Sequence, residues 1–322
     1  MPANPDVGSM IATTLELRSQ EFSDEVSESI ALWSFMAKSG NVKPAPGGTE
    51  IWQEIMEGEV ENVQAYTGSE QMELGGYDGL TAAKFAWKLV AGSVQITGSE
   101  RLQNASKQQM INLLDSRMTA LELSMKNFMG RAMYGDGTEF GGKSPGGLGL
   151  LVVTDPTTGT VGGINRATNP FWRNYSTGLV GPLTKDTIQD YMMDVWVNTS
   201  LGNEHPTIIS AGNEAFTLYS RGLQADQRFT DPALADRGFT NIRFMGVPVI
   251  LDGGIGGAQD SNVMHFLNTK YIYARPHPER NFVAMGGDRV PVNQDLVVRF
   301  MGWYGNFTVS SMRRQGKLDG NQ

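Results

Sequence analysis

The chain has 322 residues, with 34 acidic and 26 basic side chains and no Cys. A net charge of −8 offers no basic footprint for nucleic acid, which argues against sequence-specific DNA binding. The lack of Cys excludes disulfides, thiolate metal sites and a Cys nucleophile, and no apolar run approaches the roughly 18 residues of a membrane span.

Residues 1–49 are predicted to form an N-terminal arm. The start, "MPANPDVGSM", lacks the basic end and apolar run of a signal peptide. Ser23 is a candidate helix N-cap, and the stretch "NVKPAPGG" breaks the chain after the helix. One face of this helix would carry Val26, Ile30, Trp33 and Ala37.

Residues 50–83 concentrate the charge of the whole protein. They contain eight acids and neither Lys nor Arg, which leaves 26 acids and 26 bases elsewhere. Their apolar residues fit neither the period of a helix nor that of a strand, and five glycines argue against a packed helix. We therefore predict an extended, partly ribbon-like excursion that is ordered by something outside its own domain. The acids are Glu50, Glu54, Glu57, Glu59, Glu61, Glu70, Glu73 and Asp78.

The next stretch, "KFAWKLVAGSVQIT", predicts two strands joined by a turn at Ala91–Gly92. Thr97 and Glu100 then have the spacing of a capping box. A helix of about 30 residues is expected from there, ended by glycines at positions 130, 135 and 137. A coiled coil is the alternative, and the Gly-rich, strand-rich surroundings argue against it. The apolar stripe of this helix is Ile111, Leu114, Met118, Leu121, Met125 and Phe128.

The second half of the chain mixes helices with strands. A helix is predicted near Thr184, and "GNEAFTLYSRG" predicts another that ends at Gly222. Strands are predicted at "PTIIS", "IRFMGVPVILD", "NVMHFLNTKYIYA" and "DLVVRFMGWYGNFTVSSM". The order of elements indicates an α+β protein. The apolar face of the first of these helices would be Ile188, Tyr191, Met192, Val195 and Trp196.

Residues 137–144 match the phosphate-binding pattern G-x-x-x-x-G-K-[ST], with Lys143 as its lysine. A P-loop needs a strand before it and a helix after it, whereas here a helix precedes and Pro-Gly-Gly follows. The same turn places Ser144 in a G-x-S-x-G pattern, which also lacks its strand and helix. We interpret the segment as a turn and keep a P-loop NTPase as the alternative from another functional class.

Other chemistry is poorly supported. Glu57, Glu59 and Glu61 could supply a glycosidase carboxylate pair, but no neighbouring group would tune their pKa values. EF-hand spacing is absent, and a loose cation site at an interface stays open. His205, His265 and His277 lack zinc-ligand spacing. We predict no catalytic residue, no metal site and no cofactor.

The loop "GGINRATNPFWRN" combines aromatic and basic side chains after two glycines. Its aromatic residues either dock on their own domain or insert at an interface, where aromatic residues and Arg dominate binding energy. The interface residues under the second interpretation are Arg166, Phe171, Trp172 and Arg173.

Taken in order, these stretches resemble the major capsid proteins of tailed bacteriophages, which share the Hong Kong 97-type fold. "VQITGSERLQNAS" resembles the entry to the family's spine helix, although Ser99-Glu100-Arg101-Leu102 is one residue shorter than the family's S-x-E-x-L. The long helix resembles the spine itself. "VGGINRATNPFWRN" and "FMGVPVILD" resemble a segment after the spine and a late strand.

The resemblance implies an α+β fold with an N-arm (1–49), an E-loop (50–84), a peripheral domain with the spine helix (85–145 and 268–322) and an axial domain (146–267). It implies a non-enzymatic virion protein, assembled in the bacterial cytoplasm, whose hexamers and pentamers form an icosahedral head around double-stranded DNA. An encapsulin-type shell and a tail or other virion protein are the alternatives.

The resemblance also implies contacts between subunits, because the family's E-loop lies across a neighbour. A ribbon with this charge should meet basic side chains there, with Arg275, Arg280, Arg313, Arg314 and Lys317 as candidates. No Lys lies in residues 50–83 and the nearest is Lys84, so a covalent crosslink is not expected. The E-loop contact residues would be Trp52, Glu54, Glu57, Glu59, Glu61, Tyr66, Glu70 and Glu73.

Other partners follow from the same resemblance. We expect a separate scaffolding protein, a portal, a decoration protein in some form and weak non-specific contact with the packaged DNA. No membrane contact is expected.

Overall fold

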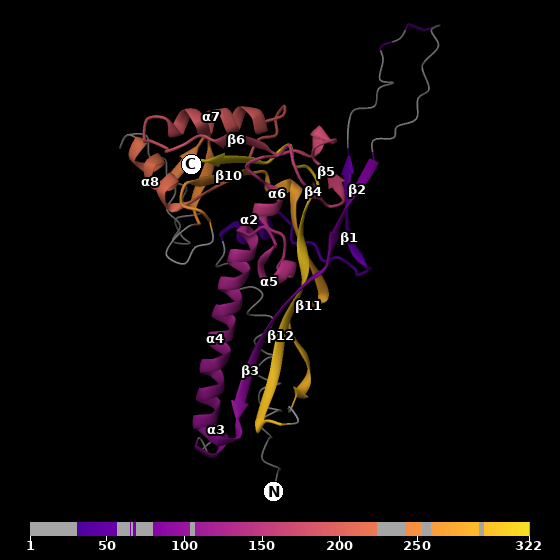
Figure 1. Ribbon diagram of the computed structural model, residues 1–322, viewed down its shortest axis with the longest axis vertical. Helices are drawn as coiled ribbons and strands as arrows, with labels where there is room; N and C mark the ends of the chain where they lie inside the picture. Colours follow the sequence, from indigo (N-terminus) through magenta and orange to yellow (C-terminus); the bar gives the residue numbers. More distant parts are fainter. Residues whose placement is uncertain are drawn as a thin grey trace.

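The computed structural model describes most of the chain, and Figure 1 shows an elongated molecule. Its long part carries helix α4 (Lys107–Tyr134) and three long strands, and its upper part carries helices α7 (Ile188–Thr199) and α8 (Asn213–Gly222). None of the described helices is long and apolar enough to cross a membrane. The described residues are 31–56, 65, 67–68, 80–103, 107–223, 242–252, 259–289 and 293–321.

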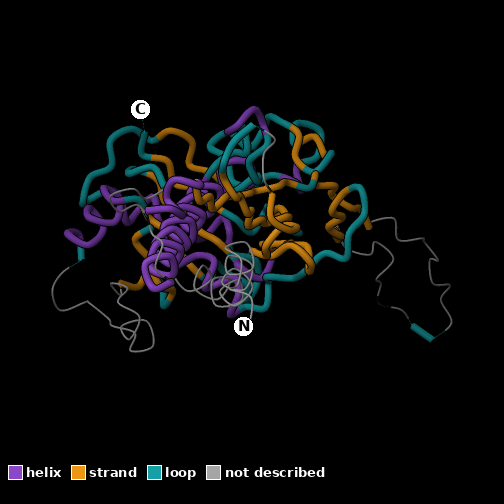
Figure 2. The backbone as a smooth tube through the Cα atoms, turned by 90° about the horizontal axis from the view of Figure 1, so that it is seen from below, coloured by secondary structure: helices purple, strands orange, loops and turns teal. Residues whose placement is uncertain are grey.

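The long part contains a three-stranded antiparallel sheet with α4 beside it, as the view from below also shows (Figure 2). Strand β3 is continuous, so the predicted turn at Ala91–Gly92 is wrong. A Cβ atom on Gly92 would lie 2.3 Å from the Leu121 side chain, so this glycine permits close packing of helix on strand. The strands, in sheet order, are β11 (Ile272–Arg289), β12 (Leu296–Val309) and β3 (Lys88–Thr97).

The capping box at the end of β3 is confirmed. The Thr97 N–H donates to Glu100 Oε2 at 2.9 Å, and the Glu100 N–H donates back to Thr97 Oγ1 at 3.4 Å. The short helix α3 (Gly98–Gln103) begins there, and α4 continues for 28 residues to Tyr134, past Gly130. The predicted stripe is confirmed where side chains are described, since Met118, Leu121 and Met125 are buried and Phe128 packs on the same core. The side chains of Ile111 and Leu114 lie outside that part.

Helix α2 (Ala31–Lys38) belongs to the hydrophobic core of the long part, which we call the first core. Trp33 is buried edge-to-face against Trp303 and Phe307, with ring centroids 6.5 and 5.8 Å away. The predicted helical face is wrong at Ala37, which is exposed, because Leu32 and Met36 take the inward positions. Ser23, Val26 and Ile30 lie outside the described residues.

A six-stranded mixed sheet forms the upper part, in the order β6-β13-β10-β7-β9-β8. Helices α7 and α8 pack on one face of it and build a second core. The apolar face predicted for α7 is confirmed, because Ile188, Met192 and Val195 are fully buried and Tyr191 and Trp196 pack beside them. The strands are β6 (Tyr175–Leu179), β7 (Ile208–Ala211), β8 (Ile242–Phe244), β9 (Val247–Leu251), β10 (Val263–Leu267) and β13 (Gly316–Asp319).

The two cores do not follow the predicted domain limits at residues 146 and 268, and the division itself stays a prediction. Strand β13, expected in the peripheral domain, lies between β6 and β10 of the upper sheet. Leu148 and Trp172, expected in the axial domain, join the first core. The remaining short elements are α5 (Glu139–Gly142), α6 (Leu148–Leu151), β4 (Thr160–Val161), β5 (Ile164–Asn165), η1 (Pro170–Trp172) and η3 (Thr269–Tyr271).

Candidate assembly surface

The two ends of the acidic segment are strands that pair with each other in an antiparallel ribbon. These strands are β1 (Glu50–Met56) and β2 (Leu80–Ala86). We call these two paired strands, residues 50–56 and 80–86, the root of the ribbon. In β1 the side chains alternate between buried and exposed, although the polarity of the sequence does not alternate. Ile51 and Ile55 face inward and are buried in the first core, whereas Trp52 is 61% exposed on the outer face. The prediction that the whole segment depends on a neighbouring molecule is therefore wrong for its root.

Specific polar contacts fix the root to its own chain. Gln53 Oε1 accepts hydrogen bonds from Arg275 Nη2 at 2.9 Å and from Thr308 Oγ1 at 3.0 Å. The backbone N–H of Lys84 donates to the carbonyl of Gly162 at 2.9 Å. Gly162 has a φ of +61°, and a Cβ there would lie 2.6 Å from the Ala83 side chain, so the close contact requires glycine. These contacts fix the position of β1 and β2 on the first core.

The outer face of the root is open. Trp52 and Glu54 are exposed there, and the ammonium of Lys84 lies 4.8 Å from the centre of the Trp52 ring, in a cation–π contact. The other predicted E-loop contacts lie outside the described residues: Glu57, Glu59, Glu61, Tyr66, Glu70 and Glu73.

The structure corrects three of the five predicted basic partners. Arg275 is half-buried against Gln53 of its own chain. Arg314 pairs with Glu204, and Lys317 pairs with Asp319 at 3.0 Å. Two exposed arginines, Arg280 and Arg313, stay candidates. The sequence could not reveal these pairs, because each joins residues distant in sequence or buried by tertiary packing.

Glu204 ties one turn of the upper part to two distant segments. Its carboxylate accepts from Lys270 Nζ at 2.6 Å, from the Tyr271 hydroxyl and from Arg314. The hydrogen bond from Lys270, followed by that from Tyr271, lowers the pKa of Glu204 to about 2. These contacts hold three segments of the same chain together.

The predicted interface loop is directed inward. Trp172 is fully buried and its indole N–H donates to the Val161 carbonyl at 2.9 Å. Arg166 is also buried and donates to the Leu151 carbonyl at 2.7 Å, and burial lowers its pKa to about 10. The interface prediction is therefore wrong for these two side chains. Phe171 packs on the first core, and Arg173 donates to the Arg166 carbonyl at 2.6 Å, so the loop docks on its own chain.

An apolar groove of about 350 Å³ runs between β3 and α4. Its walls include Leu121, Met125 and Phe128 from the helix. At its rim Leu89 is 60% exposed and Phe140 is 70% exposed. Such large apolar side chains in the open mark contact surfaces when they gather at one place.

The turn that carries Phe140 is the segment that matched the P-loop pattern. It follows α4 directly, with no strand before it, and Phe140 has a left-handed backbone with a φ of +54°. A Cβ on Gly147 would lie 2.2 Å from the Met133 carbonyl oxygen, so the glycines here let the chain pack against the end of α4. Ser144 is buried. The strand–turn–helix setting of a P-loop or a nucleophile elbow is therefore missing.

Two lysines border the groove. Lys143 lines it, and Lys88 Nζ donates to the carbonyl of Gly142 in the same turn. A carbonyl does not neutralise an ammonium, so both positive charges remain at the rim. An apolar floor with basic edges fits an acidic segment that also carries aromatic side chains.

The histidines have local partners in the fold. His205 stacks on Trp196 with ring centroids 5.2 Å apart, and His277 lies 5.8 Å from Trp87. His265 is buried, and burial lowers its pKa to about 3. Within the described ranges no group of three or more His, Asp or Glu side chains could hold a metal ion.

His265 should make stability fall in mild acid. In the unfolded chain the pKa of His265 returns to its ordinary value of 6.5. Below that pH the unfolded chain therefore binds a proton that the folded chain does not bind. Relative to His265→Phe, the free energy of unfolding should drop by about 2 kcal/mol between pH 7 and pH 5. Urea unfolding at each pH measures this. Tyr134, Lys317 and Asp319 face the ring and are the same in both proteins, so equal pH slopes would contradict the prediction.

A scan of protein-family models and a search of curated proteins give no match. Solved structures do match over nearly the whole chain. The cyanophage A-1(L) capsid asymmetric unit has a TM-score of 0.66 at 14% identity, covering 91% of this chain and 94% of that one. The capsid of a native GTA particle has a TM-score of 0.58 at 13% identity, covering 89% and 90%.

An encapsulin is also similar in structure. The holo-SrpI encapsulin complex from Synechococcus elongatus PCC 7942 has a TM-score of 0.50 at 12% identity, covering 91% of this chain and 89% of that one. The matches to the cyanophage and GTA capsids cover about nine-tenths of each chain. The chain therefore has the Hong Kong 97-type fold of tailed-bacteriophage major capsid proteins.

Proposed function

We propose that this chain is a phage major capsid protein that assembles into hexamers and pentamers of an icosahedral head around double-stranded DNA. The observation that carries the proposal is the likeness of fold to the cyanophage capsid over nearly all of both chains. The role is structural and not enzymatic. An encapsulin-type shell is the alternative within the same fold, and the higher TM-score of the cyanophage capsid favours the head protein.

The contact between subunits in this proposal joins the ribbon of one copy to the groove of the next. Residues 50–83 carry the net charge of −8, and Lys88 and Lys143 border the groove. Each exposed ion pair contributes about 1 kcal/mol or less, so the pairs set register more than affinity. The apolar floor and the exposed Leu89 and Phe140 supply the burial that makes the contact stable.

The proposal includes further partners. A separate scaffolding protein, a portal and a decoration protein would complete the virion. Outside residues 50–83 the acids and bases are equal in number, so contact with packaged DNA is weak and non-specific. Few phosphates would be neutralised, and the counterion release that drives DNA binding would be small.

Electron microscopy of the purified protein tests the proposed function. We expect closed shells of uniform diameter, with nucleic acid inside particles recovered from infected cells. Tubes or fibres would indicate a tail or other virion protein, and a protein cargo inside would indicate an encapsulin. A protein that stays monomeric at every concentration and salt, both alone and together with its scaffolding protein, would contradict the proposal.

Reversing charge on the ribbon should stop assembly. The triple variant Glu57→Lys, Glu59→Lys and Glu61→Lys removes attraction to the basic rim and adds repulsion. These residues lie outside the described part of the chain, so the prediction rests on charge alone. Sedimentation should find free subunits and no shells. The circular dichroism spectrum of these subunits should equal that of the parent protein.

A matched variant supplies the control for charge. Asp186→Lys, Asp190→Lys and Glu214→Lys make the same change at exposed residues outside the ribbon and should still assemble. Wild-type shell yield from the ribbon variant would contradict the proposed contact.

A further inference from the structure

The upper sheet turns a row of polar side chains toward the first core. His265 on β10 lies directly opposite Ser210 on β7 and Lys317 on β13 in the strand register. Their neighbours on the same face, Ile208 and Leu267, belong to the first core. A polar row in the middle of an apolar contact between two cores needs a physical reason, because burying such groups gains little stability.

A side chain from α4 enters one end of this row. The hydroxyl of Tyr134, the last residue of the helix, donates to Asp252 Oδ2 at 2.5 Å and lies 2.6 Å from Ser210 Oγ. Its ring centre lies 6.0 Å from that of His265. Gln259 completes the group, because its amide donates to the Ser210 carbonyl at 3.0 Å. The long helix is therefore bonded at one point to β7 and to the residue that follows its neighbouring strand β9.

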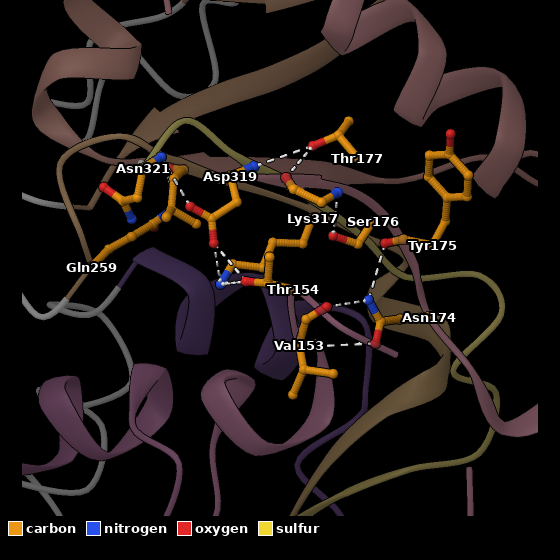
Figure 3. A network of polar contacts seen from close by, with 12 residues as sticks. Val153, Thr154, Asn174, Tyr175, Ser176, Thr177, Gln259, Lys317, Asp319 and Asn321 are labelled. Carbon is orange, nitrogen blue, oxygen red and sulfur yellow. Dashed lines mark hydrogen bonds and ion pairs between the residues drawn. The ribbon is translucent and has the colours of Figure 1, made fainter. Parts of the chain in front are cut away.

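The other end of the row is bonded to the first core as well (Figure 3). Lys317 Nζ donates to Thr154 Oγ1 at 2.8 Å, and Thr154 Oγ1 donates to Asp319 Oδ2 at 2.5 Å. Thr154 follows α6, whose Leu148 and Leu151 lie in the first core. Two polar attachments, at Tyr134 and at Thr154, thus span the seam between the cores.

Directional bonds and apolar packing constrain an interface differently. Apolar faces tolerate small shifts, whereas a buried hydrogen bond is lost when its partners move by a fraction of its length, and unpaired buried groups are costly. We propose that the seam is a latch that fixes the angle between the two cores and thereby the curvature of the assembled shell. The part about curvature rests on the proposed function.

Distance measurements across the seam test the latch. The chain has no Cys, so Leu123→Cys on α4 and Val197→Cys on α7, both exposed, would be the only sites for nitroxide labels. Labelled protein diluted with unlabelled protein gives the distance within one subunit by pulsed electron paramagnetic resonance. Tyr134→Phe keeps the ring and removes the hydroxyl, and it should broaden the distance distribution about twofold.

Tyr175→Phe is the matched control. It also removes a bond between a tyrosine hydroxyl and an aspartate, at 2.7 Å to Asp194, but both residues belong to the upper part. Its distribution should equal that of the parent. Thr154→Val cuts the second attachment and should also broaden the distribution. If Tyr134→Phe does not fold, Thr154→Val decides; an unchanged width in the variants that fold overturns the latch.

The shell supplies the second readout. Cryo-electron microscopy should find several shell diameters for Tyr134→Phe and one for Tyr175→Phe. If the parent protein makes no shells, even together with its scaffolding protein, the proposed function fails, while the label distances still decide whether the seam fixes the angle. Uniform shells from Tyr134→Phe, together with a broadened distance distribution, would overturn the link to curvature alone.

Discussion

Leu89→Asp and Phe140→Asp are each expected to abolish shell formation while the subunit stays folded. Both side chains stand at the rim of the groove between β3 and α4, 60% and 70% exposed, so the isolated subunit gains little from them. In the proposed contact they are covered by the ribbon of a neighbour, and a carboxylate there would repel that acidic segment while losing apolar burial. Light scattering and electron microscopy measure assembly, and circular dichroism measures folding.

Leu123→Asp is the matched control, because Leu123 is exposed on α4, which forms one wall of the groove, but does not itself line the groove. It should assemble like the parent protein. Assembly of the Phe140→Asp variant at the parent's yield would contradict the groove as the receiving surface. Loss of assembly in Leu123→Asp as well would show that the outer side of α4 responds to any added charge.

Trp33→Ala should lower the free energy of unfolding by about 3–5 kcal/mol, the usual range for truncating a buried aromatic side chain. Trp33 is fully enclosed and packs edge-to-face on Trp303 and Phe307, so α2 would lose its main attachment to the first core. Denaturant unfolding measures the change. Trp52→Ala removes the same side chain from an exposed position and should change stability little. Equal losses in the two variants would contradict the assignment of α2 to the core.

Local signals in the sequence predicted local structure well. The capping box at Thr97 and Glu100, the buried face of α7 and the end of α8 at Gly222 all depend on residues within one or two helical turns. The order of such elements, with four short stretches, was enough to predict the fold that the structural likeness bears out.

Signals that depend on distant partners failed. Gly92 looks like a turn residue, yet its role is set by Leu121 on a helix that follows later in the chain. Arg166 and Trp172 look like interface residues, yet backbone carbonyls of their own chain accept their hydrogen bonds. The acidic segment hid a short strand because its burial alternates while its polarity does not: the polar Gln53 is buried and the apolar Trp52 is exposed. A single sequence carries no direct record of such pairings.

The position of β13 in the upper sheet has a consequence for how the protein folds. Its parallel pairing with β6 joins Gly316 to Tyr175, and its antiparallel pairing joins Met264 to Leu318. Contacts between residues so far apart in sequence slow folding, because the loop must close before the bonds form. Until residues 316–319 leave the ribosome, β10 presents an open edge that invites pairing with other nascent chains. Production at low temperature or with chaperones should therefore raise the soluble yield.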